Sequence, residues 1–195
     1  MKILLTSLLT LVLAFLILLA LPAAGEEAVY TDTLRLHVLA ATDETPDQEA
    51  KLAVRDAILT TYGEALAACR TKKEAVAFVE QQQADIQKTA EDALRARGNE
   101  RSVTVTVAEE WFDTRTYVDF TLPAGNYTAL KITLGEGRGQ NFFCMLYPAL
   151  CITPALGETV ETESDAYSEE TFLMITRDGY GVRFRALEVL SALFG

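Results

Sequence analysis

The spacing of hydrophobic residues changes several times along this chain, and each change predicts a new element. Residues 34–40 alternate, with Leu34, Leu36 and Val38 on one side, which is the pattern of a strand. A helix is predicted from about residue 46 to residue 70, because a threonine, a proline and a capping glutamine stand at its start. A second helix is predicted from the capping threonine at residue 71 to a glycine stop at Gly98.

After residue 99 the hydrophobic period becomes two, which predicts three strands. They cover residues 103–107, 118–122 and 130–134, and a turn at residues 123–126 joins the last two. The order β-α-α-β-β-β predicts the α+β class. We expect an antiparallel sheet with a helix pair on one face, plus a short C-terminal helix.

The N-terminal segment has the composition of an export signal. Lys2 precedes an uncharged apolar run at residues 3–21, and small residues follow at positions 23–25. Residues 1–25 are therefore interpreted as a signal peptide or an uncleaved anchor, since about 20 apolar residues can span a bilayer. Both alternatives place the rest of the chain outside the cytoplasm, and membrane contact is expected only through residues 3–21 if they are retained.

The exported part divides by composition into three segments. Residues 26–156 are predicted to form the α+β domain, and the acidic residues 157–170 are interpreted as a linker. Residues 171–195 form a C-terminal segment, in which 171–176 are expected as a strand and 184–194 as an amphipathic helix.

The charge of the chain excludes one class of partner. The formal net charge is −11, and it becomes −12 when the segment that contains Lys2 is removed. Phosphate contacts require lysine and arginine, so we expect no binding to nucleic acid.

Two of the three cysteines, Cys144 and Cys151, lie seven positions apart around Tyr147. An exported chain permits a disulfide, so the two are predicted to form one; the alternative is a pair of buried thiols. Cys69 falls on the apolar stripe of the first helix and is expected to be a core thiol.

The sequence contains a single histidine, His37. An exported hydrolase would need His37 as its base, together with Asp43 or an acid such as Glu110. The other interpretation is a half-exposed histidine on a strand, which carries no catalysis. The cysteine and histidine spacing does not match a zinc site, so no metal is expected.

Three glycines at alternate positions, Gly135, Gly137 and Gly139, follow the last strand. Their spacing differs from that of a dinucleotide-binding loop, and the acid between the first two would repel phosphate. We therefore expect no cofactor and no small-molecule substrate. The glycines are interpreted as a tight backbone path that lets another chain approach closely.

An apolar segment beside the glycines is interpreted either as core or as a surface that binds a protein partner. It contains aromatic residues and methionine, which are typical of protein interfaces. The candidate partner-binding residues, with the three glycines, are Asn141, Phe142, Phe143 and Tyr147.

Arg55 interrupts the apolar stripe of the first helix. A charge on that side must extend to solvent or pair with a carboxylate, and Asp43 or Asp119 could supply one. We interpret Arg55, Asp43 and Asp119 as structural charges rather than catalytic groups.

Two long blocks of this sequence resemble the stage II sporulation protein R family. Residues 34–59 read LRLHVLAATDETPDQEAKLAVRDAIL, and residues 117–151 read YVDFTLPAGNYTALKITLGEGRGQNFFCMLYPALC. Residues 181–184 and the apolar stretch after them add a weaker match. Two pairs of residues depart from the family pattern: Ala41-Thr42 stands in place of Asn-Ser, and Phe142-Phe143 in place of Trp-Trp.

The resemblance implies a signalling protein without catalytic activity of its own. Such proteins are exported from the forespore into the space between the two membranes around it. There they activate a membrane-embedded aspartic protease, the implied partner, which removes the pro-sequence of sigma E. A membrane-tethered scaffold and the hydrolase that uses His37 are the alternatives.

Overall fold

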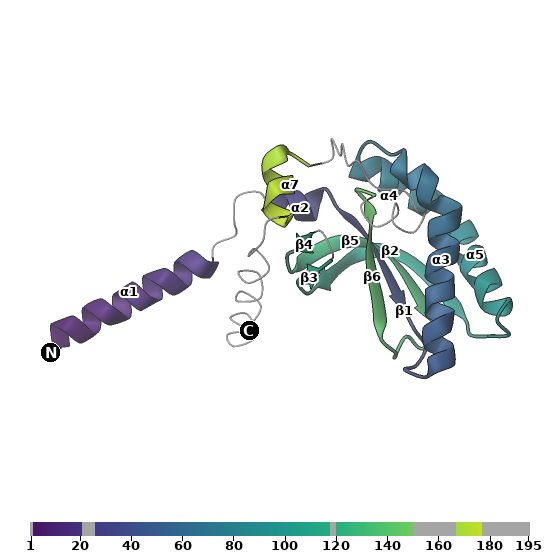
Figure 1. Ribbon diagram of the computed structural model, residues 1–195, viewed down its shortest axis with the longest axis horizontal. Coiled ribbons are helices and arrows are strands. Elements are labelled where there is room, and N and C mark those ends of the chain that lie inside the picture. Colours follow the sequence, from purple (N-terminus) through teal and green to yellow (C-terminus); the bar gives the residue numbers. More distant parts are fainter. Residues whose placement is uncertain (1, 21–25, 118–119, 150–166, 177–195) are drawn as a thin grey trace. The chain divides into compact units, whose positions relative to one another are not determined.

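The computed structural model describes residues 2–20, 26–117, 120–149 and 167–176 (Figure 1). The chain divides into two compact units. The larger unit comprises Thr31–Glu110 and Asn126–Ala166, and the smaller unit comprises the remaining three segments.

A four-stranded sheet is the centre of the larger unit. Its strands lie in the order β2-β5-β1-β6, where β1 is Leu34–Leu39, β2 is Val103–Phe112, β5 is Gly125–Leu134 and β6 is Asn141–Tyr147. β1 runs parallel to β5 and antiparallel to β6. The parallel β1–β5 pair departs from the antiparallel sheet predicted above. Parallel strands need a long crossover connection, and the helices that follow β1 in the sequence provide one.

Three helices cover one face of this sheet. They are α3 (Thr45–Ala67), α4 (Lys72–Gln81) and α5 (Gln83–Arg95), and Figure 1 shows α3 and α5 side by side. The second predicted helix is thus two, because Gln82 adopts φ −92° and ψ 6° and interrupts the helical path. The predicted α+β class is confirmed.

The apolar alternation of the strands builds the core between sheet and helices. Leu34, Leu36 and Val38 are fully buried, and they pack with the apolar side chains of α3, α4 and α5. The signals at Thr71 and Gly98 act as predicted. Thr71 accepts a hydrogen bond from the backbone of Glu74, and Gly98 takes the left-handed φ of +68° after α5. The capping threonine and glutamine expected at the start of the first helix do not cap it, because α3 begins at Thr45 itself and its N-cap residue, Glu44, makes no side-chain cap hydrogen bond.

The strand predicted at residues 118–122 pairs differently from the prediction. In the smaller unit, β4 (Thr121–Leu122) pairs antiparallel with β3 (Arg115–Thr116) instead of forming a hairpin with β5. The Tyr117 N–H donates to the Phe120 carbonyl oxygen at 2.8 Å, so the chain turns back before β5 begins. Val118 and Asp119 lie outside the described residues.

The smaller unit also contains α1 (Lys2–Ala20), α2 (Glu26–Thr31) and α7 (Glu169–Thr176). The strand predicted for residues 171–176 is wrong, since α7 occupies them. Ser168 accepts a hydrogen bond from the Thr171 N–H at 3.2 Å and so caps the helix. The helix predicted at 184–194 falls outside the described residues, as does most of the acidic linker. Within the described parts of the chain, no helix is both long enough and apolar enough to cross a membrane.

Candidate functional site

Two turns that are distant in sequence lie against each other at one end of the larger unit. The turn between β1 and α3, residues 40–44, contacts the glycine turn between β5 and β6, residues 135–140. The Gly139 N–H donates to the Ala40 carbonyl oxygen at 2.9 Å. The two blocks that carry the family resemblance therefore meet here. We call residues 40–51 and 135–142 together the turn cluster.

The glycines allow this close approach. Gly135 and Gly137 have φ values of +56° and +62°, a conformation that side chains with a Cβ atom rarely adopt. A Cβ atom on Gly139 would lie 2.2 Å from the carbonyl oxygen of Thr42. The chain that approaches the glycines is thus the β1–α3 turn of the same molecule.

Lys51 connects α3 to the glycine turn. Its side chain is only 6% exposed. The ammonium group donates to the carbonyl oxygen of Gln140 at 3.0 Å and to the side-chain oxygen of Gln48 at 2.7 Å. Burial lowers the pKa of Lys51, and the nearby carboxylate of Asp43 acts against this shift. Asp43 itself accepts a hydrogen bond from the Gln140 N–H at 2.7 Å.

Asp47 is the second centre of the turn cluster, and the sequence did not single it out. Its buried carboxylate accepts hydrogen bonds from Thr42 at 2.7 Å, Arg101 at 2.9 Å and Asn99 at 3.3 Å. The Thr42 hydrogen bond is the largest influence on its pKa, which lies below the ordinary value although burial acts in the other direction. An acid in the first turn of α3 was the available signal, but two of its three partners, Asn99 and Arg101, come from a loop more than 50 positions away.

The two adjacent phenylalanines point to opposite faces of the sheet, as strand alternation requires. Phe142 lies on the helix side, where the Arg55 guanidinium carbon is 4.8 Å from its ring centre. Phe143 lies on the other side and stacks on His37 at 4.6 Å between ring centres. Both rings are half-buried. They do not form one aromatic patch.

The remaining candidate residues of β6 differ in exposure. Asn141 is exposed, whereas Tyr147 is buried and donates its hydroxyl to the Arg70 carbonyl oxygen at 2.7 Å, so Tyr147 is part of the core. Cys144 is buried, and no disulfide joins the cysteines of the described residues. Cys151 lies outside the described residues, so the bond between Cys144 and Cys151 stays a prediction.

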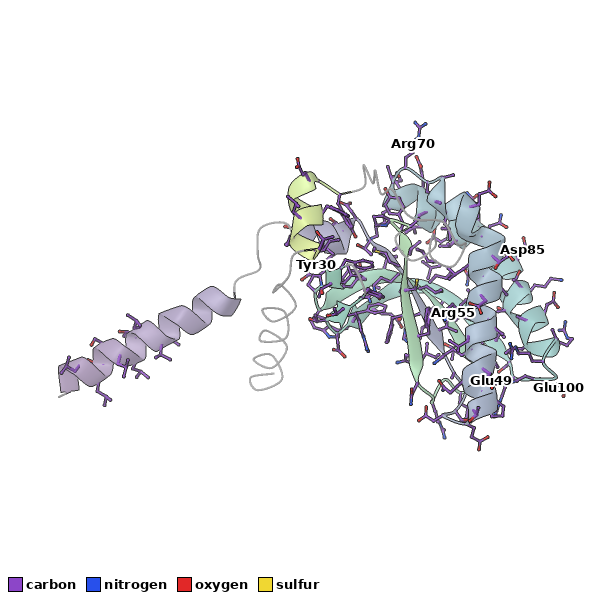
Figure 2. The ribbon with its side chains drawn as sticks, in the orientation of Figure 1. Tyr30, Glu49, Arg55, Arg70, Asp85 and Glu100 are labelled. Atoms are coloured by element: carbon purple, nitrogen blue, oxygen red, sulfur yellow. The ribbon has the colours of Figure 1, made fainter. Side chains whose placement is uncertain are left out.

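Arg55 does not pair with Asp43, one of the two acids proposed for it. Figure 2 shows Arg55 on the side of α3 toward β6, where two of its nitrogens lie 2.7 and 2.6 Å from one Asp56 oxygen. Asp43 is bound to the backbone of Gln140 instead. Asp119 lies outside the described residues. The arginine reaches past the apolar stripe and along the edge of the sheet, which leaves its charge partly solvated.

His37, Glu110 and Lys131 form a polar group on the sheet face opposite the helices. The Nδ1 atom of His37 lies 2.8 Å from one oxygen of Glu110, and the ammonium group of Lys131 binds the other oxygen. Burial raises the pKa of Glu110, but these two contacts outweigh it and the pKa is lowered. Of the two acids considered for His37, the structure brings Glu110 to it. His37 is 8% exposed, so a substrate has little access.

The described residues offer no metal site. In that part of the chain, no group of three or more histidine, cysteine, aspartate and glutamate side chains is placed to hold a metal ion. The turn cluster is instead a densely hydrogen-bonded protein surface, suited to hold side chains such as Phe142 in fixed positions.

The comparisons with known proteins agree with the motifs that meet in the turn cluster. The sequence model described as Stage II sporulation protein R matches residues 30–156. The chain is similar to Stage II sporulation protein R of Bacillus subtilis (strain 168), with 32% identity over 136 residues, or 68% of this chain. It spans 59% of the length of that relative. No solved structure matches the chain. The chain belongs to the stage II sporulation protein R family.

Proposed function

We propose that this protein is the exported signal by which the forespore activates sigma E in the mother cell during sporulation. Its partner is a membrane-embedded aspartic protease, which removes the pro-sequence of sigma E when this protein binds the exported part of the protease. The protein acts by binding and carries out no chemistry itself. Membership of the stage II sporulation protein R family supports this proposal.

The position of the turn cluster is the observation that carries the proposal. The two blocks of sequence that resemble the family meet there through hydrogen bonds such as those of Lys51 and Asp43 with Gln140. Their meeting point is rich in backbone and amide contacts and presents the half-buried ring of Phe142. Such a rigid surface loses little conformational freedom when a partner binds.

The N-terminal segment agrees with export. A lysine, an apolar run and small residues precede the acidic start of the domain. We propose that the domain acts in the space between the forespore and mother-cell membranes. It is either released by cleavage near residue 25 or held by the apolar run.

Co-expression in a non-sporulating bacterium tests the proposal. The host would carry this chain, the protease and pro-sigma E, and an immunoblot would follow the shortening of pro-sigma E. Shortening that requires both this chain and its N-terminal 25 residues is the expected result. Cells that lack the protease are the control. Shortening without this chain, or none with it, would contradict the proposal.

A second candidate, an exported cell-wall hydrolase, is favoured by one contact. His37 lies 2.8 Å from Glu110, the geometry of a base with an orienting acid. Replacement of His37 by alanine separates the candidates, because a hydrolase would lose all activity. A binding signal with this replacement would still activate the protease, so pro-sigma E would still be shortened as long as the fold persists.

A further inference from the structure

A partly exposed cation is held in a fixed position on α3. The Arg55 guanidinium carbon lies 4.8 Å from the ring centre of Phe142, and the side chain is 26% exposed. Stacking on an aromatic ring restricts the orientation of the planar guanidinium group. Its donors are therefore held in one plane before any partner binds.

The described part of the chain does not use all the donors of Arg55. A guanidinium group has five N–H donors. Among the described residues, Asp56 is its one hydrogen-bond partner, and a single oxygen of Asp56 accepts both contacts. The Asp56 side chain is 60% exposed, and exposed ion pairs are weak. A second carboxylate can displace Asp56 or bind beside it.

Apolar surface adjoins this cation. Leu52 lies one helical turn before Arg55 and is 38% exposed, and the half-buried ring of Phe142 has its centre 4.8 Å from the guanidinium carbon. An arginine beside an aromatic ring and an exposed leucine has the composition of an interface centre. We call Leu52, Arg55 and Phe142 the arginine patch.

We propose that the arginine patch binds a segment of the partner protease that carries an aspartate or glutamate next to an apolar residue. The carboxylate would accept paired hydrogen bonds from Arg55, and the apolar side chain would cover Leu52 and Phe142. Paired N–H donors in a fixed plane match the two oxygens of a carboxylate. This inference rests on the proposed function and names the chemistry of its contact.

The charge of the whole chain opposes such a contact only at long range. The formal net charge is −11, so an acidic segment is repelled at long range. Physiological salt screens this repulsion beyond about 8 Å, whereas the contact with Arg55 acts at hydrogen-bond distance. The arginine patch is thus a local exception on an acidic protein.

The test measures how much of this chain is needed for half-maximal processing of pro-sigma E in the co-expression host. Arg55→Lys keeps the charge but loses the planar pair of donors, so the requirement should rise about tenfold. Asp56→Asn releases Arg55 from its competing carboxylate, so the requirement should fall. Circular dichroism of each purified variant verifies the fold.

A matched control lies on α5. Arg95 and Asp92 also form an ion pair, with the Arg95 side chain 69% exposed. Arg95→Lys should leave the requirement unchanged. An unchanged requirement in Arg55→Lys, or a higher one in Asp56→Asn, would overturn the assignment while the proposed function stood. Absence of processing with the unaltered chain would overturn the proposed function and this inference together.

Charge reversal identifies the opposite carboxylate. Arg55→Glu should abolish processing, and protease variants that restore it can be selected. Recovery of lysine or arginine in place of an acid in the exported part of the protease supports the contact. Suppressors confined to this chain contradict it.

Discussion

The ammonium group of Lys51 lies 3.0 Å from the carbonyl oxygen of Gln140, although the two residues are 89 positions apart. This contact holds the glycine turn against the first half of α3. The same helix carries Arg55 one turn further on. A buried lysine on the neighbouring helix thus supports the position of Phe142, two residues after Gln140.

Removal of the Lys51 ammonium group should destabilise the domain. Lys51→Met retains the apolar stem but leaves the Gln140 carbonyl oxygen and the Gln48 amide oxygen without this donor. We expect a loss of about 1–2 kcal/mol in the free energy of unfolding, measured with urea. Lys88→Met is the control, because Lys88 pairs with Asp92 at the exposed surface. If Lys51→Met unfolded at the same urea concentration as the unaltered protein, the structural role of Lys51 would be contradicted.

A methyl group at Gly139 should force the two turns apart. Its Cβ atom would lie 2.2 Å from the Thr42 carbonyl oxygen, and a backbone atom cannot rotate away. We expect Gly139→Ala to cost about 3 kcal/mol, compared with about 1 kcal/mol for Gly98→Ala. Gly98 has open space around it and only an unfavourable φ of +68°. Thermal unfolding of both variants checks which one loses more stability. Equal losses would show that the two turns can move apart at little cost.

Asp47 should make the domain sensitive to acid. Its pKa is lowered in the folded state, first by the Thr42 hydrogen bond, so its stabilisation is complete above the unfolded pKa of about 3.9. That stabilisation is lost as the pH falls from there through the folded pKa. Urea unfolding between pH 7 and pH 3 should therefore give a steeper decline for the unaltered protein than for Asp47→Asn. The pKa of Glu110 is also lowered in the folded state, so Glu110 adds the same loss of stability at low pH to both proteins. Parallel declines would contradict the role of Asp47.

Alanine variants of the two phenylalanines should show which face of β6 binds the partner. Phe142→Ala removes the ring under Arg55 and should strongly reduce the processing of pro-sigma E. Phe143→Ala removes the ring on His37, on the opposite face of the sheet, and should leave processing in place. The co-expression assay, with the folded state verified by circular dichroism, distinguishes them. Equal loss in both variants would place the partner on the whole of β6 instead.

The elements of the domain could be predicted because their signals are local. Alternating residues in β1, the cap at Thr71 and the left-handed Gly98 act within a few positions of the chain. The helix break at Gln82 and the helix at 169–176 were missed, since their short stretches are ambiguous in period. The family could also be read from ordered motifs, which are a property of the sequence.

The partners of individual side chains depend on contacts between distant segments. The pattern of residues along the chain does not contain these contacts. Glu110 reaches His37 across 73 positions, whereas the closer Asp43 binds a backbone amide. Arg55 binds the adjacent Asp56, and β6 brings the ring of Phe142 to its guanidinium group. Periodicity determines which face of an element is apolar. Strand order and register determine which two faces meet, and they depend on packing of the whole larger unit.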